Sequence, residues 1–513
     1  MIEFALLACP LLIIAMAGRV PLPQLVLVAV IGGYLLLPTQ GGWNPPILPP
    51  FNKQTIPSLT VLLVALVMCA STARASMALA DPDGLNQRGW IPRSPVMLIP
   101  IGLLLVGAFA TVLTNGDTLT YGPRRIPGLR LYDAFSIIMI SMVLLVPLFL
   151  GWKFFAHPDR LRLLLHGLII AALAYSVLAL YEIRMSPQLN RMIYGFFPHD
   201  WGQHVRGGGY RPLVFLEHGL ALAIFMSMAV IAAFGVYRLS GRTQKGLYFG
   251  AGGWLLLTLL LSNSLAALLI VVMLTPIVLL SSTRMQVTAA AVIAAMTLSY
   301  PMLRSADVIP TEQLVEVMRE IAPARAPSLN FRFINEDILL EHARERPLAG
   351  WGTFGRNRVY DETGADQTVI DGMWIVEFTI GGWLGYLGTF GLLTLPIIVA
   401  AARMRKDTVD PEVGILSLLL AAQLIYLIPN GFMSPVSWLI AGALLGRLEL
   451  SRAAVPRTED DAGAPVRAPT ARGRTKPAAT TGEAPRPEPD RNRGGQVYTR
   501  QTSHHRRVET QGG

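Results

Sequence analysis

Long apolar runs recur along the chain from its N-terminus to about residue 450. Many have about 18–25 residues, the length of a helix that crosses the hydrocarbon core of a bilayer. The runs are solidly apolar and do not alternate with polar residues, which excludes a membrane β-barrel. The pattern therefore predicts an all-α fold, a polytopic transmembrane helical bundle with about 12–13 spans.

The apolar stretch 247–282 is longer than one bilayer crossing requires, so we divide it at Ser262, Asn263 and Ser264. The first and last expected spans are short and suit an interfacial or re-entrant helix. The expected spans are 3–17, 22–38, 58–73, 95–114, 133–152, 163–182, 213–236, 247–263, 265–282, 287–302, 376–402, 413–429 and 434–448.

Composition agrees with a membrane protein. The chain is 52% hydrophobic and only 15% charged, with a mean hydropathy of +0.47, whereas soluble chains carry about 25% charged residues. Cys9 and Cys69 both lie inside apolar segments and are expected to be buried thiols, not a disulfide or metal site. The net charge of +10 comes largely from short loops and a basic tail, which does not indicate nucleic-acid binding.

Lysine and arginine in the short loops predict the orientation of the spans. The basic loops are assigned to the cytoplasm. The loops on the opposite, outer side of the membrane are then 39–57, 115–131, 183–212 and 303–375. Loop 115–131 conflicts with the rule because it carries Arg124, Arg125 and Arg130; either a functional arginine cluster or a topology error would explain it. The basic loops assigned to the cytoplasm are 74–93, 153–162, 238–245, the turn at 284, and 403–406.

The two ends of the chain have different characters. The triplet from Ala15 to Ala17 imitates a signal-peptidase site, but the preceding residues lack Lys and Arg and contain Glu3, which favours an uncleaved first span. Residues 1–450 are expected to form the membrane domain. Residues 451–513 are rich in Pro, Ala, Thr, Gly and Arg and are expected to form a disordered, basic cytoplasmic tail, with or without a role in lipid or partner contact.

The segment 303–375 is the longest polar stretch between spans and is expected to be a large periplasmic loop. Its residues 311–321 have apolar side chains at helical spacing, which predicts a short amphipathic helix on the membrane or on the protein. A second helix is expected from Asn330, a favourable N-cap, to about Arg346. Pro347 ends it, and a glycine-hinged turn follows to Gly352.

Several chemistries are excluded by the motifs that the sequence lacks. There is no P-loop, no HExxH and no paired CxxC, so we expect neither an ATPase nor a zinc site. Asp81 and Asp83 form a DxD, but it lies in a predicted cytoplasmic loop, and such triplets are common by chance. Loop 39–57 has no acidic residue, which argues against the metal-dependent transferases of lipid-linked sugar phosphates.

The candidate functional residues lie at outer membrane edges. Arg206 and Arg211 flank a glycine-rich loop, where guanidinium groups can hold a diphosphate bidentately or merely snorkel at the interface. Glu217 and His218 follow inside an apolar run, where ionisable groups mark either a binding site or a structural hydrogen bond. Asp371 precedes the last long span, as a functional carboxylate or as an ordinary helix-start carboxylate.

Three motifs together resemble the O-antigen ligase and polymerase superfamily of bacterial lipid-linked polysaccharide enzymes, over roughly residues 160–430. They are the stretch from Arg206 to His218, Arg332 on a helix before the turn Pro347-Leu348-x-Gly350-Trp351-Gly352, and Gly382-x-x-Gly385-Tyr386. The ligases carry His followed by Asn, Ser or Gln where this chain has Asp371 and Gly372. This departure favours a polymerase of O-antigen or exopolysaccharide repeat units over a ligase.

The resemblance implies an inner-membrane glycosyltransferase whose site faces the periplasm and needs no metal or cofactor. The donor would be a glycan on a polyprenyl diphosphate and the acceptor a second glycan, with membrane lipid and other assembly or export proteins as further partners. Arg211, Arg206 and Arg332 would stabilise the leaving diphosphate, and Asp371 would orient or deprotonate the acceptor hydroxyl, with inversion at the anomeric carbon. The other expected substrate-binding residues are Glu217, His218, Trp351 and Tyr386.

Two other functions remain open. One is O-antigen ligation; the other is non-enzymatic transport or flipping of lipid-linked glycans, in which the arginines would bind headgroups without chemistry. A flippase is expected to carry charges inside several spans and two-fold repeats. The sequence has few such charges and no evident repeat, so it favours the transferase.

Overall fold

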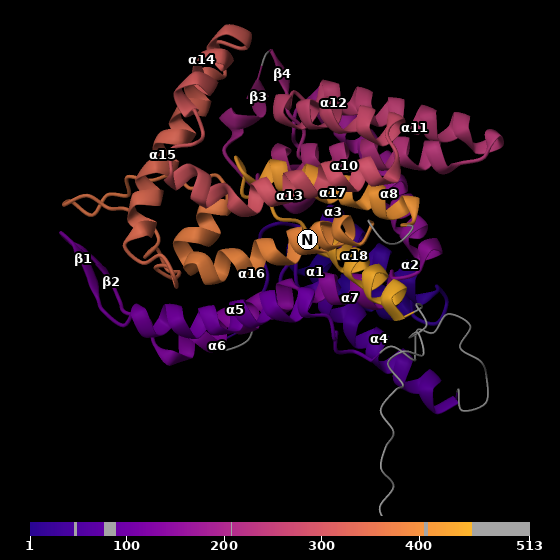
Figure 1. Cartoon of the computed structure of the whole chain (residues 1–513), viewed down its shortest axis with the longest axis horizontal. Coiled ribbons are helices and arrows are strands. Elements are labelled where there is room, and N and C mark those ends of the chain that lie inside the picture. Colours follow the sequence, from indigo (N-terminus) through magenta and orange to yellow (C-terminus); the bar gives the residue numbers. More distant parts are fainter. Residues whose placement is uncertain (46–48, 76–88, 207, 405–408, 454–513) are drawn as a thin grey trace, which may run out of the picture. The chain divides into compact units, whose positions relative to one another are not determined.

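The computed structural model describes residues 1–45, 49–75, 89–206, 208–404 and 409–453. The predicted tail beyond residue 453 and the DxD of Asp81 and Asp83 lie outside the described residues. The described part of the chain is almost entirely helical (Figure 1), which confirms the prediction of an all-α fold.

The helices occur in every segment where the sequence predicts a span. In chain order they are α1 (Ile2–Met16), α2 (Leu22–Leu27), η1 (Val28–Gly32), α3 (Gly33–Leu36), α4 (Ile56–Ala75), α5 (Pro95–Thr114), α6 (Leu131–Leu144), α7 (Val146–Phe154), α8 (Pro158–Met185), α9 (Leu189–Tyr194), η2 (Trp201–His204), α10 (Gly219–Leu239), α11 (Arg242–Leu261), α12 (Leu265–Leu280), α13 (Thr283–Ser305), α14 (Thr311–Ile321), α15 (Ala326–Arg344), α16 (Met373–Arg403), α17 (Pro411–Leu427) and α18 (Pro435–Ala453). Two short antiparallel hairpins pair β1 (Leu119–Tyr121) with β2 (Arg124–Ile126) and β3 (Val205–Arg206) with β4 (Gly209–Tyr210).

Six helical segments in the described part of the chain are long and apolar enough to cross a membrane, and five shorter apolar segments accompany them. The protein is therefore a polytopic helical membrane protein. The predicted division between two spans at residues 262–264 is confirmed, since α11 ends at Leu261 and α12 begins at Leu265. The six long segments are Pro95–Thr114, Leu131–Phe154, Pro158–Met185, Gly219–Leu239, Thr283–Ser305 and Met373–Arg403.

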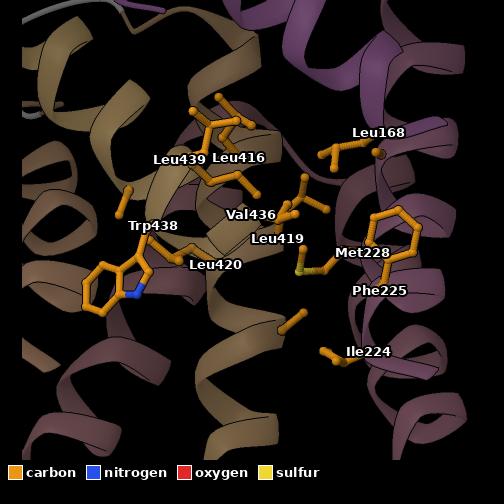
Figure 2. Packing of buried hydrophobic residues seen from close by; sticks show 14 of the residues in the cluster. Leu168, Ile224, Phe225, Met228, Leu416, Leu419, Leu420, Val436, Trp438 and Leu439 are labelled. Atoms are coloured by element: carbon orange, nitrogen blue, oxygen red, sulfur yellow. The ribbon is translucent and has the colours of Figure 1, made fainter. Parts of the chain in front are cut away.

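The core forms around α10, which packs against α8, α11, α12 and α17. Figure 2 shows Phe225 and Met228 of α10 facing apolar side chains of α8, α17 and α18, among them Leu168, Leu419 and Val436. Because α10 is buried on nearly all sides, its apolar residues contact protein rather than lipid.

The start of α10 differs from the prediction of a span from residue 213. Residues 211–218 are not helical and, apart from the half-buried Glu217, are buried; Val214 has a positive φ of 56°. The reason lies in α8, whose buried Glu182 accepts hydrogen bonds from the amides of Leu213 (2.9 Å) and Val214 (2.7 Å), and also from that of Leu189 (3.0 Å). Irregular backbone at membrane depth requires such partners because no water is present to supply them.

Two further side chains complete this support. The Tyr175 hydroxyl accepts a hydrogen bond from the Phe215 amide (3.0 Å), and the Lys53 ammonium donates to the Phe215 carbonyl (2.6 Å). Burial lowers the pKa of Lys53 to about 8, with the charge of Glu217 opposing the shift. We call residues 211–218 the unwound segment.

We expect Glu182→Ala to destabilise the fold severely, because it leaves the two buried amides of Leu213 and Val214 without acceptors, at a cost of about 1–3 kcal/mol each, and also removes the acceptor of the part-buried Leu189 amide. The measurement is the yield of monodisperse protein in detergent and its midpoint of thermal unfolding. Arg184→Ala is the matched control, since Arg184 lies two residues further along α8 and is exposed. Equal stability of Glu182→Ala and the control would contradict this account of the unwound segment.

A kink in α16 explains two sequence motifs at once. Gly382 breaks the helix with φ 58° and ψ −154°. The turn of residues 347–352 supplies the hydrogen bonds that the break removes: the amides of Trp351 and Gly352 donate to the carbonyls of Thr379 (2.8 Å) and Ile380 (2.9 Å). In return, the amides of residues 383 and 384 donate to the carbonyls of residues 347 and 348, at 2.8 and 3.1 Å.

The two predicted helices of the large loop are present. α14 has the predicted bounds, and its apolar residues Leu314, Val317 and Ile321 are exposed. α15 begins at Ala326 and not at Asn330, because Pro327 occupies its first turn, where proline is favourable.

Loop 115–131 packs against the large loop. The carboxylate of Asp117 lies 3.1 Å from the buried Arg356 guanidinium and 3.3 Å from that of Arg346, and these charges help to hold the pKa of Asp117 below its ordinary value against the effect of burial. The Arg124 guanidinium lies 4.5 Å from the centre of the Tyr360 ring. This loop therefore shares its end of the molecule with residues 303–375, as predicted despite its arginines.

Candidate functional site

The predicted residues Arg332 and Asp371 meet where α15 crosses the start of α16. Arg332 Nε lies 3.2 Å from Asp371 Oδ2, and both side chains are partly exposed, at 26% and 38%. Asp371 makes no cap hydrogen bond to α16, whose N-cap is Gly372. The carboxylate is thus directed to an arginine of the large loop.

A second set of contacts holds α15 against α13 and α16 close to this ion pair. One turn after Arg332, the carboxylate of Glu336 accepts a hydrogen bond from the Trp374 indole (3.1 Å) and lies 3.5 Å from Arg304 Nε of α13. Arg304 also contacts Asp337 at 2.7 Å. Burial raises the pKa of Glu336 to about 7, against the opposing effects of Trp374 and Arg304.

Arg211 lies at the beginning of the unwound segment and is 4% exposed. Its Nη2 donates to the carbonyl of Asn263 (3.1 Å), a residue with φ 52° in the turn between α11 and α12. The Tyr426 hydroxyl of α17 lies within Coulombic range of both Arg211 and Arg332. The structure thus brings two predicted arginines from distant segments to one end of α17.

Three other predicted residues lie in or just before the unwound segment. His218 is buried and caps α10 through Nδ1, which accepts a hydrogen bond from the Leu220 amide (3.0 Å), and its ring stacks on Phe432 with centroids 5.4 Å apart. Glu217 is half-buried and lies within Coulombic range of Lys53. The backbone of Arg206 belongs to β3, but its side chain lies outside the described part of the structure.

A cavity of about 540 Å³, with Glu217 in its wall, lies between α5, α6 and α16. Its walls are mainly apolar, and Glu217 and Glu377 are among its polar groups. Glu377 Oε2 accepts a hydrogen bond from Thr389 (2.8 Å) across the kink of α16. Gly431 lines the cavity and lies close to the backbone carbonyl of Asp371, whereas Arg332, Asp371 and Arg211 are not among the residues that line it.

The side chains of Trp351 and Tyr386, which are predicted to bind substrate, are buried and pack against other side chains of the protein. The Trp351 indole donates to the His342 carbonyl (2.7 Å), and its ring lies between His342 and Arg346. Tyr386 is fully buried, and its hydroxyl donates to the Thr297 carbonyl. The Trp351 side chain thus joins the turn to the end of α15, and the Tyr386 side chain joins α16 to α13.

Sequence reasoning missed several residues that build the site, notably Glu182, Tyr175, Lys53, Glu336 and Arg304. Glu182 carried a usable signal, because a carboxylate at the end of an apolar run requires a partner. Glu336 follows Arg332 by four residues on a predicted helix and therefore shares its face. Lys53, Tyr175 and Arg304 carried no local signal, since their partners are distant in sequence.

Three histidines also approach one another beside Arg211, although the sequence predicts no metal ligands. The ring centroids of His199 and His204 lie 4.7 and 4.8 Å from that of His218. Burial lowers the pKa of His204 to about 4, so its ring is neutral at neutral pH.

Comparison of the chain with protein-family models and with curated proteins gives no match.

Proposed function

We propose that this protein is a glycosyltransferase of the bacterial inner membrane that polymerises glycan repeat units carried on a polyprenyl diphosphate. The observation that carries the proposal is the ion pair between Arg332 and Asp371 at 3.2 Å. It joins a cation suited to a diphosphate and a carboxylate suited to an acceptor hydroxyl. Arg211 adds a second guanidinium within Coulombic range of the same Tyr426.

The chemistry is a displacement at the anomeric carbon of the donor. The acceptor hydroxyl oxygen forms the new bond to that carbon, the bond from carbon to the diphosphate oxygen breaks, and the hydroxyl proton passes to Asp371. Polyprenyl diphosphate leaves with the bonding electron pair. Arg211 and Arg332 stabilise the negative charge that develops on it, and each such donor is worth a few kcal/mol in the transition state, about 10²–10³ in rate.

The partial exposure of the Arg332–Asp371 pair suits an exchange of partners. Surface ion pairs contribute only about 0–1 kcal/mol, so an arriving diphosphate can displace the carboxylate from the guanidinium at little cost. The carboxylate is then available to the acceptor hydroxyl. Donor binding would in this way prepare the acceptor side of the site.

The proposed location follows from charge. Arg162 of α8 pairs with Glu412 of α17, and Arg447 of α18 pairs with Asp410 at 2.5 Å, next to loops that the sequence assigns to the cytoplasm. The candidate site lies in loops 183–212 and 303–375, which belong to the set without the excess of basic residues. Because basic loops remain in the cytoplasm, we place the candidate site on the periplasmic face, where lipid-linked glycans are exposed after their translocation.

The test uses purified protein in vesicles that contain a polyprenyl-diphosphate-linked repeat unit, with the chain length of the glycan as the readout. We expect elongation by the native protein and a loss of at least about a hundredfold in rate for Asp371→Asn, the usual cost of removing a general base.

Asp361→Asn is the matched control for this variant. Asp361 is an exposed carboxylate of the same loop that bonds only within residues 361–367 in the contacts described. A small loss in Asp371→Asn with a large loss in Asp371→Ala would mean that the carboxylate orients the acceptor and takes no proton. Native rates in both variants would remove Asp371 from the mechanism.

A further inference from the structure

The fold places His199, His204 and His218 around one point at the outer end of α10. His218 precedes α10, His204 ends η2, and His199 lies on the segment between α9 and η2. One nitrogen of each ring lies within 4.8 Å of the others. Imidazole is the commonest side-chain ligand of divalent transition metals.

The tautomer of His204 directs a lone pair into this cluster. Its Nδ1 lies 3.2 Å from the Arg211 carbonyl, which accepts only, so Nδ1 carries the proton. Nε2 is then unprotonated, is buried, and has no hydrogen-bond partner among the residues that the structure describes. A metal-bound histidine usually donates its other ring N–H to a carboxylate, a backbone carbonyl or water, as His204 Nδ1 does here to the Arg211 carbonyl.

We propose that His199, His204 and His218 bind a divalent transition metal of the Zn²⁺ type. Tetrahedral coordination at about 2.0–2.1 Å needs nitrogens about 3.4 Å apart, so the three rings must approach one another by up to about 1.4 Å. His199 is exposed and can make most of that movement. The fourth position would be open to water.

Two neighbouring groups decide the cost of binding. The charges of Arg211 and Asp200 both act on His204 and have opposite signs, so the weaker effect of Asp200 offsets part of the repulsion between the guanidinium and a cation. His218 Nδ1 now accepts a hydrogen bond from the Leu220 amide, and Nε2 lies 3.3 Å from Gln203 Oε1. If Nε2 is to bind the metal, the ring proton must move to Nδ1, which then no longer accepts from Leu220. The loss of these two hydrogen bonds is a small cost compared with the gain of three metal–nitrogen bonds.

The bound metal would clamp the segment before β3 to the N-terminus of α10. Arg211 lies directly between these elements, and its amide and carbonyl both bond to His204. The metal would therefore fix the backbone from which the Arg211 side chain extends. This role is structural and goes beyond the proposed transfer reaction, which it neither requires nor replaces.

The test is metal binding by the full-length protein, purified without a histidine tag, stripped with a chelator and titrated with Co²⁺. We expect one equivalent of bound Co²⁺ with the absorption of a tetrahedral site, displaced by Zn²⁺. His199→Ala and His204→Ala should each weaken binding at least tenfold. His166→Ala should bind as the native protein does, because His166 stacks on Tyr248 in another part of the fold.

His199→Ala keeps the test decisive if His204→Ala fails to fold, because His199 is exposed and caps no helix. Absence of stoichiometric binding by the native protein, or native affinity in His199→Ala, would overturn the proposal. Since no glycan donor is present, neither result depends on the proposed transferase activity.

Discussion

Arg332→Ala is expected to reduce glycan polymerisation by at least about a hundredfold while leaving the protein folded. The stability of the variant follows from the geometry, because the ion pair with Asp371 is partly exposed and such pairs contribute about 0–1 kcal/mol. The loss of activity follows from the chemistry, because removal of one donor to a developing anion costs about 10²–10³ in rate. Vesicle assays of elongation, together with thermal unfolding, measure both quantities.

Arg344→Ala is the matched control, since Arg344 lies on the same helix and donates to the Ser305 carbonyl (3.0 Å), away from Asp371. Arg211→Lys provides a second test at the buried arginine, where an ammonium keeps the charge but cannot hold a diphosphate in two parallel hydrogen bonds. We expect it to fold and to remain impaired. Native rates in both Arg332→Ala and Arg211→Lys would contradict diphosphate binding by these residues.

Gly382→Ala is expected to prevent folding or to lower stability by about 3 kcal/mol or more. The backbone angles of Gly382 suit glycine alone. A Cβ there would lie 2.5 Å from the Pro347 carbonyl oxygen and from the Leu348 carbonyl carbon. The methyl group would therefore separate the turn from the kinked helix and break their four backbone hydrogen bonds.

Gly381→Ala is the control because the added methyl would contact nothing within 4 Å, and its backbone is not in the glycine-only region. We expect native or slightly higher stability for it, as alanine is favourable in a helix. The midpoint of thermal unfolding in detergent measures the difference. Equal stability of the two variants would show that the turn does not depend on the kink.

The sequence predicts the helices well because the bilayer requires long apolar segments, and the length of each run is visible directly. It also singles out Arg211 and Asp371, because charged residues beside apolar runs are conspicuous, whereas Arg332 is named only through the resemblance; the roles of all three stay predictions. It predicts the start of α10 wrongly, since residues 213–216 are as apolar as a helix interior. Only the fold reveals that Glu182 and Tyr175 hold them in another conformation.

The relation between the two glycine motifs could not be read from the chain either. The turn at residues 347–352 and the kink at Gly382 each appear as a separate local signal. The turn and the kink depend on each other, because each supplies the hydrogen bonds that the other lacks. The histidine cluster is a similar case, since His199, His204 and His218 have no recognised ligand spacing and meet only through the path of the chain.

The most direct measurement of the central claim is the stoichiometry of the reaction in vesicles that contain this protein alone and the lipid-linked repeat unit. We predict one polyprenyl diphosphate released for each new glycosidic bond, with inversion at the anomeric carbon. Arg332→Ala should abolish both products together. Movement of the donor between leaflets without bond formation, or bond formation without released polyprenyl diphosphate, would contradict the account.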